Sequence, residues 1–389
     1  MRRTLAWMLT AGLFMMTGCG SNAASPVDSG AIVASEGSAS DPAFRVEVVT
    51  DFDQPWAMAF LPDGRLLVTE KAGTMQLLDL SAEVPVKLPV TGVPEVDFGG
   101  QGGLGDVALH PEFNENGIVY FSYAEAGPGD TRGAIVQRAR FDCGEAACSL
   151  SDIEDVWRQA PKVSGRGHYS HRIVFGPDGD LWIASGDRQK MDPSQDLGNT
   201  LGTIVRLNAD GSVPADNPFV DLGGDSAAIW SYGHRNILGL AFAPDGVLWD
   251  LEHGPAGGDE LNAVVRGGNY GWPVVSDGKH YDGTDIPNHD TRDDFLPPAV
   301  SWTPVIAPGN LVFYGGDIFP RWRGHAIASG LKSFGLVFVE VDGDNATEVA
   351  RYPLGARIRC VIEGPDGALW VLEDERGDSQ GRLLKLTAG

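Results

Sequence analysis

The chain has 389 residues and a formal net charge of −24. A nucleic-acid-binding surface requires clustered positive charge, so this acidic balance excludes DNA and RNA from the expected partners. With 42% hydrophobic residues, 52 glycines and 25 prolines, the chain has enough apolar residues for a core and many turns, which excludes global disorder.

The N-terminus has the pattern of an export signal. Arg2 and Arg3 precede an apolar run over residues 5–16, which is too short to span a bilayer as a mature helix. Residues 16–19 (Met-Thr-Gly-Cys) are similar to a bacterial lipobox, which predicts a lipid on Cys19 and a location on the periplasmic side of the envelope. An ordinary signal peptide cut nearby is the alternative.

A turn followed by an apolar strand recurs along the rest of the chain. The turn is Pro-Asp-Gly or Asn-Gly in most copies, and the copies begin at Leu61, His110, Gly176, Ala243, Phe319 and Gly364. Such a turn before an alternating or continuous apolar run predicts β-structure, and units of roughly 45–75 residues are typical of propeller blades with loop insertions. The sequence therefore predicts an all-β protein with one six-bladed β-propeller.

The expected organisation has three parts. Residues 1–19 form the signal peptide, residues 20–42, which are rich in Ser, Ala and Gly, form a flexible tether, and residues 43–389 form the propeller. Several small β-domains are the alternative, but no linker separates the repeat copies.

Three cysteines remain besides Cys19. Cys143 and Cys148 lie in a short loop between strand-like runs, and in an oxidising compartment they are expected to form a local disulfide, with two free thiols as the alternative. Cys360 is left over and is expected to be a buried packing residue.

Loops at one end of a propeller converge on its axis, so residues next to successive repeats can meet in space. Polar residues of these loops are Gln101, His168, His171, Asp187, His234, Arg235, Asn236, Glu252, His253, Asp259, Glu260, Asn269, Lys332, Arg357 and Arg359. Among them, Arg235, Lys332, Arg357 and Arg359 follow or precede apolar strands. Cations so placed suit an anion with several carboxylates or phosphates, whereas surface salt bridges are the alternative.

The segment EHGPAGGDELN, residues 252–262, combines glycines with carboxylates. Glycines allow close approach of the backbone, and exposed carbonyls beside carboxylates are the hard oxygen ligands that Ca²⁺ prefers. No zinc motif is present. A calcium site is predicted here, and an ordinary glycine-rich turn is the alternative.

Residues 44–387 resemble the soluble aldose sugar dehydrogenases that use pyrroloquinoline quinone (PQQ), in the glucose/sorbosone dehydrogenase family. The segments that carry the resemblance occur in order along the chain; they are QGGLGDVALHPEF, GDLWIASGD, DLGNTLGTIVRLNADGSVPADNPF, IWSYGHRNILGLAF, EHGPAGGDELN, NYGWPV and RIRCVIEGPDGALWV. The family fold is a six-bladed propeller, in agreement with the repeats.

The resemblance implies a cofactor site. PQQ is a planar quinone with three carboxylates, and the family pattern implies that Lys332, Arg357 and Arg359 bind it electrostatically while Gln101 and Asn236 hydrogen-bond it. It also implies a Ca²⁺ on the cofactor, held by the backbone carbonyls of Gly254 and Pro255. A second, structural Ca²⁺ is implied at Glu260 and the backbone of Tyr270.

The implied reaction is oxidation of an aldose at C1 to the lactone. His168 would take the hydroxyl proton as general base, Asp187 would orient its ring, and Arg235 would lie by the C5 carbonyl of the quinone, which receives the hydride. Electrons would leave to an external cytochrome or quinone, since the chain has no CxxCH haem motif.

The chain departs from the family pattern at two positions. His171 occupies a position where relatives usually have Gly, so a narrower pocket or a shifted cofactor is expected; Cys360 replaces a usual Asp. His234 and His253 are expected to be structural.

Two other functions are compatible with a propeller. A calcium-dependent hydrolase or lactonase would not need the cationic set. A non-catalytic, envelope-anchored binding module would not need His168, and it would need an exposed aromatic patch.

Overall fold

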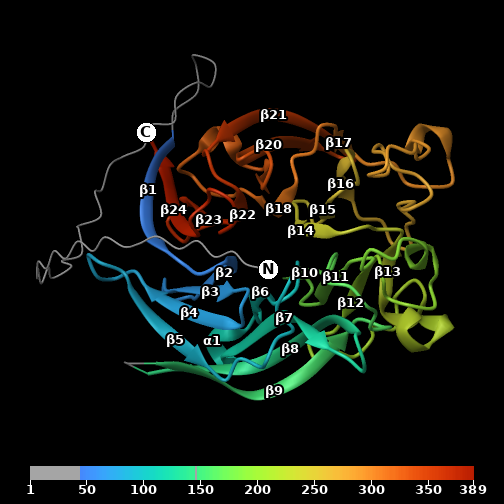
Figure 1. The fold of residues 1–389 in the computed structure, drawn as a ribbon. Coiled ribbons are helices and arrows are strands. Elements are labelled where there is room, and N and C mark those ends of the chain that lie inside the picture. Colours follow the sequence, from blue (N-terminus) through green and yellow to red (C-terminus); the bar gives the residue numbers. More distant parts are fainter. Residues whose placement is uncertain (1–43, 145–146) are drawn as a thin grey trace, which may run out of the picture. The chain divides into compact units, whose positions relative to one another are not determined.

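The computed structural model describes residues 44–144 and 147–389, which are almost entirely β-structure (Figure 1). The predicted signal peptide, tether and lipidated Cys19 lie outside the described residues. Within the two described ranges, no helix combines the length and the apolar character needed to cross a bilayer.

The strands form six four-stranded antiparallel blades, as the repeats predicted. The first blade consists of β2 (Pro55–Phe60), β3 (Leu66–Glu70), β4 (Thr74–Asp79) and β5 (Val86–Thr91). The second consists of β6 (Leu104–Leu109), β7 (Ile118–Ala126), β8 (Arg132–Cys143) and β9 (Cys148–Arg158). The third consists of β10 (Ser170–Phe175), β11 (Leu181–Ser185), β12 (Thr203–Leu207) and β13 (Ile229–Tyr232).

The remaining three blades follow in chain order. The fourth consists of β14 (Ile237–Phe242), β15 (Leu248–Glu252), β16 (Asp259–Ala263) and β17 (Val300–Trp302). The fifth consists of β18 (Pro308–Phe313), β19 (Ala326–Gly330), β20 (Gly335–Asp342) and β21 (Asn345–Pro353). The sixth consists of β22 (Ile358–Glu363), β23 (Leu369–Glu373), β24 (Arg382–Ala388) and, from the other end of the chain, β1 (Phe44–Asp51).

The blades form a closed ring. The first strand of each blade contacts the first strand of the next, in the cycle β2, β6, β10, β14, β18, β22 and back to β2. Pairing of β1 with β24, from Phe44 opposite Ala388 to Asp51 opposite Arg382, completes the last blade (Figure 1).

Helices in the described residues are short and lie in connections. They are α1 (Phe113–Asn116), η1 (Asp192–Gln195), η2 (Val220–Leu222), η3 (Gly224–Ala228), η4 (His289–Thr291) and η5 (Pro320–Trp322).

The turn of each repeat copy lies between the first and second strands of a blade, and the apolar run after it forms the second strand. In the first copy the Leu61 N–H donates to the Arg65 carbonyl at 2.8 Å and the Gly64 N–H donates to the Leu61 carbonyl at 2.9 Å. Gly64 has φ +88°, a conformation that glycine adopts without steric cost. The turns therefore fix the same two strands in every blade.

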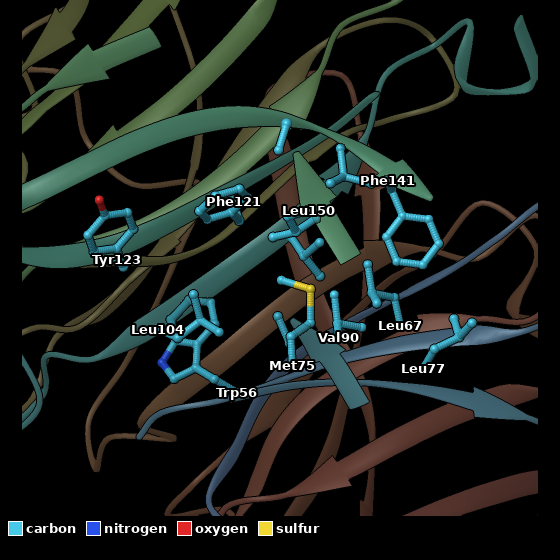
Figure 2. Packing of buried hydrophobic residues seen from close by; sticks show 14 of the residues in the cluster. Trp56, Leu67, Met75, Leu77, Val90, Leu104, Phe121, Tyr123, Phe141 and Leu150 are labelled. Carbon is cyan, nitrogen blue, oxygen red and sulfur yellow. The ribbon is translucent and has the colours of Figure 1, made fainter. Parts of the chain in front are cut away.

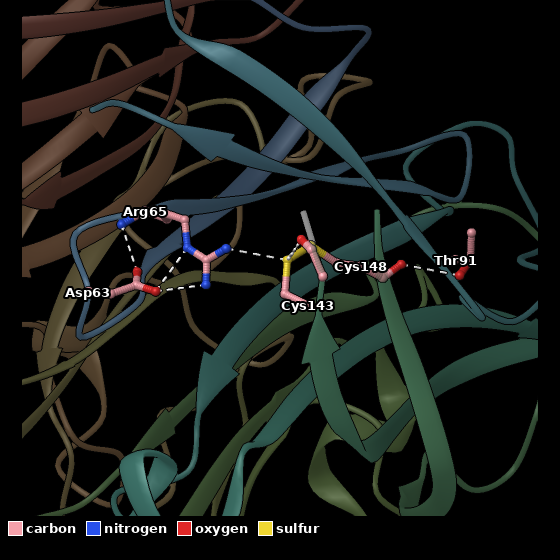
Figure 3. The surroundings of a disulfide bond; sticks show 6 residues. Asp63, Arg65, Thr91, Cys143 and Cys148 are labelled. Carbon is pink, nitrogen blue, oxygen red and sulfur yellow. Dashed lines mark hydrogen bonds and ion pairs between the residues drawn. A yellow bond between two sulfur atoms is a disulfide. The ribbon is translucent and has the colours of Figure 1, made fainter. Parts of the chain in front are cut away.

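The first two blades are joined into one eight-stranded sheet by parallel pairing of Val90 and Thr91 of β5 with Cys148 and Ser149 of β9. The predicted disulfide, Cys143–Cys148, lies at this junction (Figure 3). Thr91 Oγ1 donates to the Cys148 carbonyl at 3.2 Å.

The core lies between the faces of neighbouring blades. Figure 2 shows the cluster between the first two blades, in which Trp56 and Leu67 of the first blade pack with Phe121 and Leu150 of the second. Cys360 is buried in the cluster between the sixth and first blades, which agrees with its predicted packing role.

One irregularity recurs in all six blades. The register between the first and second strands shifts at the start of the first strand, after Pro55, Leu104, Ser170, Ile237, Pro308 and Ile358. A bulge bends the strand and redirects its side chains, so each blade has irregular backbone at the same end.

Candidate active site

The candidate residues gather at this irregular end of the propeller. Gln101, His168 and Arg235 shortly precede first strands, whereas Asp187 and Asp374 shortly follow second strands. Since the first residue of β10 pairs with the last residue of β11, segments that precede and follow this hairpin end side by side. The same pairing holds between β22 and β23.

A cavity of about 190 Å³ opens here. The cavity is rich in positive charge, because four cationic side chains and one carboxylate line it; these are Lys71, Arg357, Arg359, Arg376 and Asp374. The surplus of three positive charges (four minus one) suits an anionic ligand.

Asp374 holds two of these arginines in place. Its Oδ2 accepts from Arg357 Nε at 3.0 Å and from Arg357 Nη2 at 2.9 Å, and its Oδ1 accepts from Arg359 Nη2 at 3.2 Å. Burial alone would raise the pKa of Asp374, but the charges of Arg359 and Arg357 hold it below the usual range. Burial and the neighbouring charge of Arg359 lower the pKa of Lys71.

Two amides in the cavity lining connect the cavity to the segment that carries His168. Gln101 Oε1 accepts from the His168 N–H at 2.7 Å, and Asn236 Oδ1 accepts from the Ser170 N–H at 3.2 Å. Both amides line the cavity. Arg188 holds the same segment by donating to the carbonyls of Gly165 and Gly167 at 2.6 and 2.8 Å.

His168 forms a buried pair with Asp187. The distance from His168 Nδ1 to Asp187 Oδ1 is 2.7 Å, and Trp272 Nε1 donates to Asp187 Oδ2 at 2.8 Å. With Nδ1 occupied as a donor to the carboxylate, Nε2 is left as the acceptor. Asp187 therefore selects the tautomer in which Nε2 can take a proton.

The charges of this pair are set by burial and by hydrogen bonds. Burial lowers the pKa of His168 in spite of Asp187, so the ring is neutral at pH 7. Burial would raise the pKa of Asp187, but hydrogen bonds from His168, the Gln189 N–H and Trp272 keep it below its ordinary value. A neutral imidazole beside an ionised carboxylate is the state that a general base requires.

Arg235 lies beside this pair rather than in the cavity lining. Its Nη1 donates to the His253 carbonyl at 3.0 Å, and its guanidinium is 5.1 Å from the Trp272 ring centroid. Its buried Nε has no hydrogen-bond partner in the described residues. The positive charge of Arg235 also contributes to the lowered pKa of His168.

The structure separates the predicted cationic set. Arg357 and Arg359 line the cavity, but Lys332 is exposed, and its neighbour Leu331 lines the cavity instead. Sequence reasoning missed four residues that also line it, namely Lys71, Arg376, Asp374 and Trp56. Lys71 directly follows the apolar strand β3, and this position could have identified it from the sequence as a cavity residue.

The glycine-rich loop after β15 is rigidly held. Asp259 accepts from the Gly254 N–H at 2.9 Å and from the Ala307 N–H at 2.7 Å. A Cβ on Gly254 would lie 2.1 Å from the Gly258 carbonyl oxygen, so only glycine fits there. Gly254 and Pro255 are buried in this folded loop.

Glu260, the predicted carboxylate ligand of a second ion, belongs to a buried acidic cluster. Burial, followed by the charges of Glu252, Asp277 and Asp250, raises the pKa of Glu260 well above its ordinary value. Burial also raises the pKa of Asp259 to about 6. Several carboxylates buried together with no equal positive charge fit a divalent cation.

The second predicted ligand, the Tyr270 carbonyl, lies within reach of this cluster but is already engaged. His289 Nε2 is 3.1 Å from the Tyr270 carbonyl oxygen, and His289 Nδ1 is 4.0 Å from Glu260 Oε1. A carbonyl oxygen has two lone pairs, so one remains for an ion.

The two histidines predicted to be structural have structural contacts. His234 Nδ1 is 3.1 Å from Glu252 Oε1 and 3.7 Å from Asp250 Oδ2, and its Nε2 is 2.9 Å from Ser231 Oγ. Although burial acts against it, the charges of Asp250 and Glu252 raise the pKa of His234. His253 Nε2 is 2.7 Å from the Pro308 carbonyl oxygen.

The chain matches the glucose/sorbosone dehydrogenase family model over residues 52–385. The chain belongs to the glucose/sorbosone dehydrogenase family. An aldose sugar dehydrogenase of Escherichia coli (strain K12) is 40% identical over 352 residues, which cover 88% of this chain and 92% of that protein. Quinoprotein glucose dehydrogenase B of Acinetobacter calcoaceticus is 28% identical over 86% of each chain.

Solved structures of the family agree with the fold. The apo-form of the soluble aldose sugar dehydrogenase from Escherichia coli superposes with a TM-score of 0.83 at 39% identity, covering 89% of this chain and all of that one. The PQQ-bound form of an aldose sugar dehydrogenase from Streptomyces coelicolor superposes with a TM-score of 0.71 at 28% identity, covering 89% and 98%. The six-bladed propeller is therefore the family architecture, and the homologues support an oxidoreductase that acts on sugars.

Proposed function

We propose that this protein oxidises aldose sugars at C1 to lactones with PQQ as cofactor and Ca²⁺ as an auxiliary ion. The observation that carries the proposal is a cavity with a surplus of positive charge next to the buried His168–Asp187 pair. Neither a hydrolase nor a binding module needs both features.

The donor set of the cavity fits PQQ. Three carboxylates match the surplus of three positive charges, and Gln101 and Asn236 add neutral hydrogen-bonding groups to the lining. Arg357 and Arg359 would bind carboxylates, and Lys71 and Arg376 would join them, whereas Lys332 would need to turn inward to contribute. When bound, the quinone supplies the two-electron acceptor that the side chains of the protein lack.

The protein's own part in the reaction is proton transfer and charge stabilisation. His168 Nε2 would accept the proton of the sugar hydroxyl while Asp187 holds Nδ1 and stabilises the resulting imidazolium. Trp272 keeps Asp187 in place. Arg235 would stabilise negative charge that develops on the cofactor side of the site.

The calcium sites follow from the loop after β15. The carbonyls of Gly254 and Pro255 would hold the ion that contacts the cofactor, and Glu260 with the Tyr270 carbonyl would hold a structural ion. Burial, followed by repulsion from neighbouring carboxylates, raises the pKa of Glu260, and a cation in the acidic cluster would favour its ionised form.

The partners and location belong to the same proposal. The electrons would pass to an external cytochrome or quinone, and the protein would act on the periplasmic side of the envelope, anchored through a lipid on Cys19.

Reconstitution tests the proposal. The purified protein, PQQ and Ca²⁺ are combined with a panel of aldoses and an artificial dye acceptor, and dye reduction is measured together with PQQ binding. His168→Gln should lower kcat by 10²- to 10⁴-fold and leave PQQ affinity within a few-fold. His325→Gln, which changes a histidine packed against Trp322, is the control and should retain wild-type turnover.

Dye reduction that persists without PQQ, or no PQQ binding by the wild-type protein, would contradict the proposal.

A further inference from the structure

His171 is a buried imidazole in the wall of the cavity. It is 3% exposed, and it lines the cavity together with Trp56, Lys71 and Tyr169. Neither Nδ1 nor Nε2 has a hydrogen-bond partner in the described residues. A buried polar group without a partner costs free energy, because it gave up water and gained nothing in return.

The backbone of His171 carries a second cost. Its φ is +75°, and His168 and Ser170 in the same segment have φ of +50° and +64°. This left-handed region is sterically unfavourable for residues with a Cβ and free of cost for glycine. Such strain is retained mainly at functional sites.

The ring is held where it is. It stacks on Tyr169 with ring centroids 5.2 Å apart and meets the edge of Trp56 at 5.8 Å. A Cβ on Gly105 would lie 2.8 Å from His171 Cβ, so the chain keeps a glycine behind the ring to make room for it. The His171 carbonyl accepts from Ser122 Oγ at 2.7 Å, which fixes the backbone.

The other buried or half-buried histidines near the site differ from His171. In each of them at least one ring nitrogen lies within hydrogen-bonding distance of a protein oxygen, as for His168, His234, His253 and His289. In each of those rings, a protein group accounts for at least one of the polar atoms. Within residues 44–144 and 147–389, no group accounts for the polar atoms of His171.

The charges around His171 keep its ring neutral. Burial, followed by the positive charges of Arg188, Lys71 and Arg172, lowers the pKa of His171 to about 3. The facing carboxylates are bound elsewhere, Asp106 to Arg172 and Asp374 to Arg357 and Arg359. A neutral imidazole offers one donor and one acceptor to a ligand.

We propose that His171 is a cofactor-binding residue, whose ring nitrogens hydrogen-bond the quinone cofactor in the cavity and fix its position. The inference rests on the proposed function and deepens it, because it adds a cofactor contact that the family resemblance does not imply. The backbone strain and the unsatisfied nitrogens are then offset by a contact that forms only when the cofactor is bound.

The test measures PQQ binding and the stability of the cofactor-free protein separately. PQQ is titrated in the presence of Ca²⁺ into wild-type protein and His171→Phe, followed by tryptophan fluorescence and by the absorption spectrum of bound PQQ. Phe keeps the flat ring and removes both nitrogens. The Kd should rise about tenfold and the spectrum should shift, while the Tm of the cofactor-free protein should stay the same or rise.

His110→Phe is the matched control. The His110 ring also stacks on an aromatic ring, that of Tyr120 at 6.2 Å, but it does not line the cavity. Its Kd for PQQ should stay within twofold of wild type. Asn at position 171 tolerates a left-handed backbone and keeps a polar side chain. His171→Asn should therefore give a Kd between those of wild type and His171→Phe. If His171→Phe does not fold, the Kd of His171→Asn tests the inference.

An unchanged Kd for PQQ in His171→Phe and His171→Asn overturns the inference, and a fall in the Tm of the cofactor-free protein with unchanged Kd assigns His171 a packing role instead. Wild-type protein that binds no PQQ overturns the proposed function, and this inference with it.

Discussion

Two groups of like charge lie at the same end of the propeller, and they have opposite signs. The first and sixth blades contribute the cationic cluster Lys71, Arg357, Arg359 and Arg376 to the lining of the cavity, where Asp374 is the only carboxylate among the described residues. The fourth blade buries the acidic cluster Asp250, Glu252, Asp259 and Glu260, and the half-buried Asp277 of its long loop lies near them.

The comparison teaches that the net charge of a chain does not determine the charge of its sites. The protein carries a formal charge of −24, yet it lines its main cavity with cations. Burying an excess of one sign is costly unless a counter-charge is present. Each cluster therefore has the charge that suits the ligand proposed for it, an organic polyanion in one case and a metal cation in the other.

The largest expected effect tests the cationic cluster. Arg359→Met removes a guanidinium that Asp374 orients, and it leaves that carboxylate less well paired beside the anion. We expect the Kd for PQQ to rise about 100-fold, because truncating one partner of a buried charge pair costs about 2–5 kcal/mol. Titration of PQQ followed by fluorescence measures the effect.

Arg351→Met provides the control, since Arg351 is paired with Glu348 on β21, away from the cavity. A rise of less than tenfold in Arg359→Met would show that the cationic cluster does not bind the anion.

The next prediction concerns the pH dependence of the free energy of unfolding, which reports on His171 beside the cationic cluster. The folded-state pKa of His171 is lowered from 6.5 to about 3, so the unfolded chain binds the proton more tightly. The contribution of neutral His171 to the free energy of unfolding is therefore fully present above pH 6.5, and it is lost as the pH falls toward 3. Between pH 6.5 and 4.5 the loss is about 2–3 kcal/mol.

His171→Asn lacks this proton site, so its free energy of unfolding should fall by about that much less over the same interval. Urea denaturation at pH 6.5 and at pH 4.5 gives the two values. Equal losses in both proteins would mean that His171 does not titrate as its surroundings indicate.

A smaller effect of opposite sign is expected in the acidic cluster. Glu260→Gln removes one of several buried, mutually repelling carboxylates, so in EDTA the free energy of unfolding should rise by about 1 kcal/mol. The stabilisation produced by added Ca²⁺ should shrink in the same variant, because a ligand has been lost.

Thermal denaturation with and without Ca²⁺ measures both changes. Glu340→Gln alters an exposed carboxylate on β20 and should change neither. If the Glu260→Gln variant is less stable in EDTA and responds equally to Ca²⁺, the acidic cluster is not a cation site.

The smallest effect concerns the residue between the two clusters. Arg235 Nη2 donates to Tyr281 Oη at 3.3 Å, but Tyr281 is 78% exposed, whereas the His253 carbonyl and Trp272 hold the same guanidinium from inside. Tyr281→Phe should change kcat/KM for an aldose by less than twofold, since an exposed hydrogen bond contributes little. A larger loss would assign the positioning of Arg235 to the loop that carries Tyr281.

The fold could be predicted because each blade carries its own local signal. A Pro-Asp-Gly turn and the apolar strand after it need no distant information, and six such units over one chain leave few architectures. The Cys143–Cys148 disulfide was predictable for the same reason, because the two cysteines lie in one short hairpin.

The site was predicted less completely because side-chain direction depends on register. Lys71 is the first residue after β3 and lines the cavity, whereas Lys332 is the second residue after β19 and is exposed. Alternate residues of an extended chain point to opposite sides. The sequence alone does not determine which of two successive residues after a strand points into the cavity. The left-handed backbone of His171 likewise depends on contacts from other blades, such as the hydrogen bond from Ser122.

The pairing of β1 with β24 has a consequence for how the chain folds. Phe44 meets Ala388 across 344 residues (388 minus 44), and the last blade lacks a strand until this contact forms. Contacts so distant in sequence are slow to form, because their loop-closure entropy is lost before they stabilise the chain. The last blade can therefore be completed only after β24 has been synthesised. A chain that ends before Arg382 would expose the free edges of β23 and β1 to pairing with other chains.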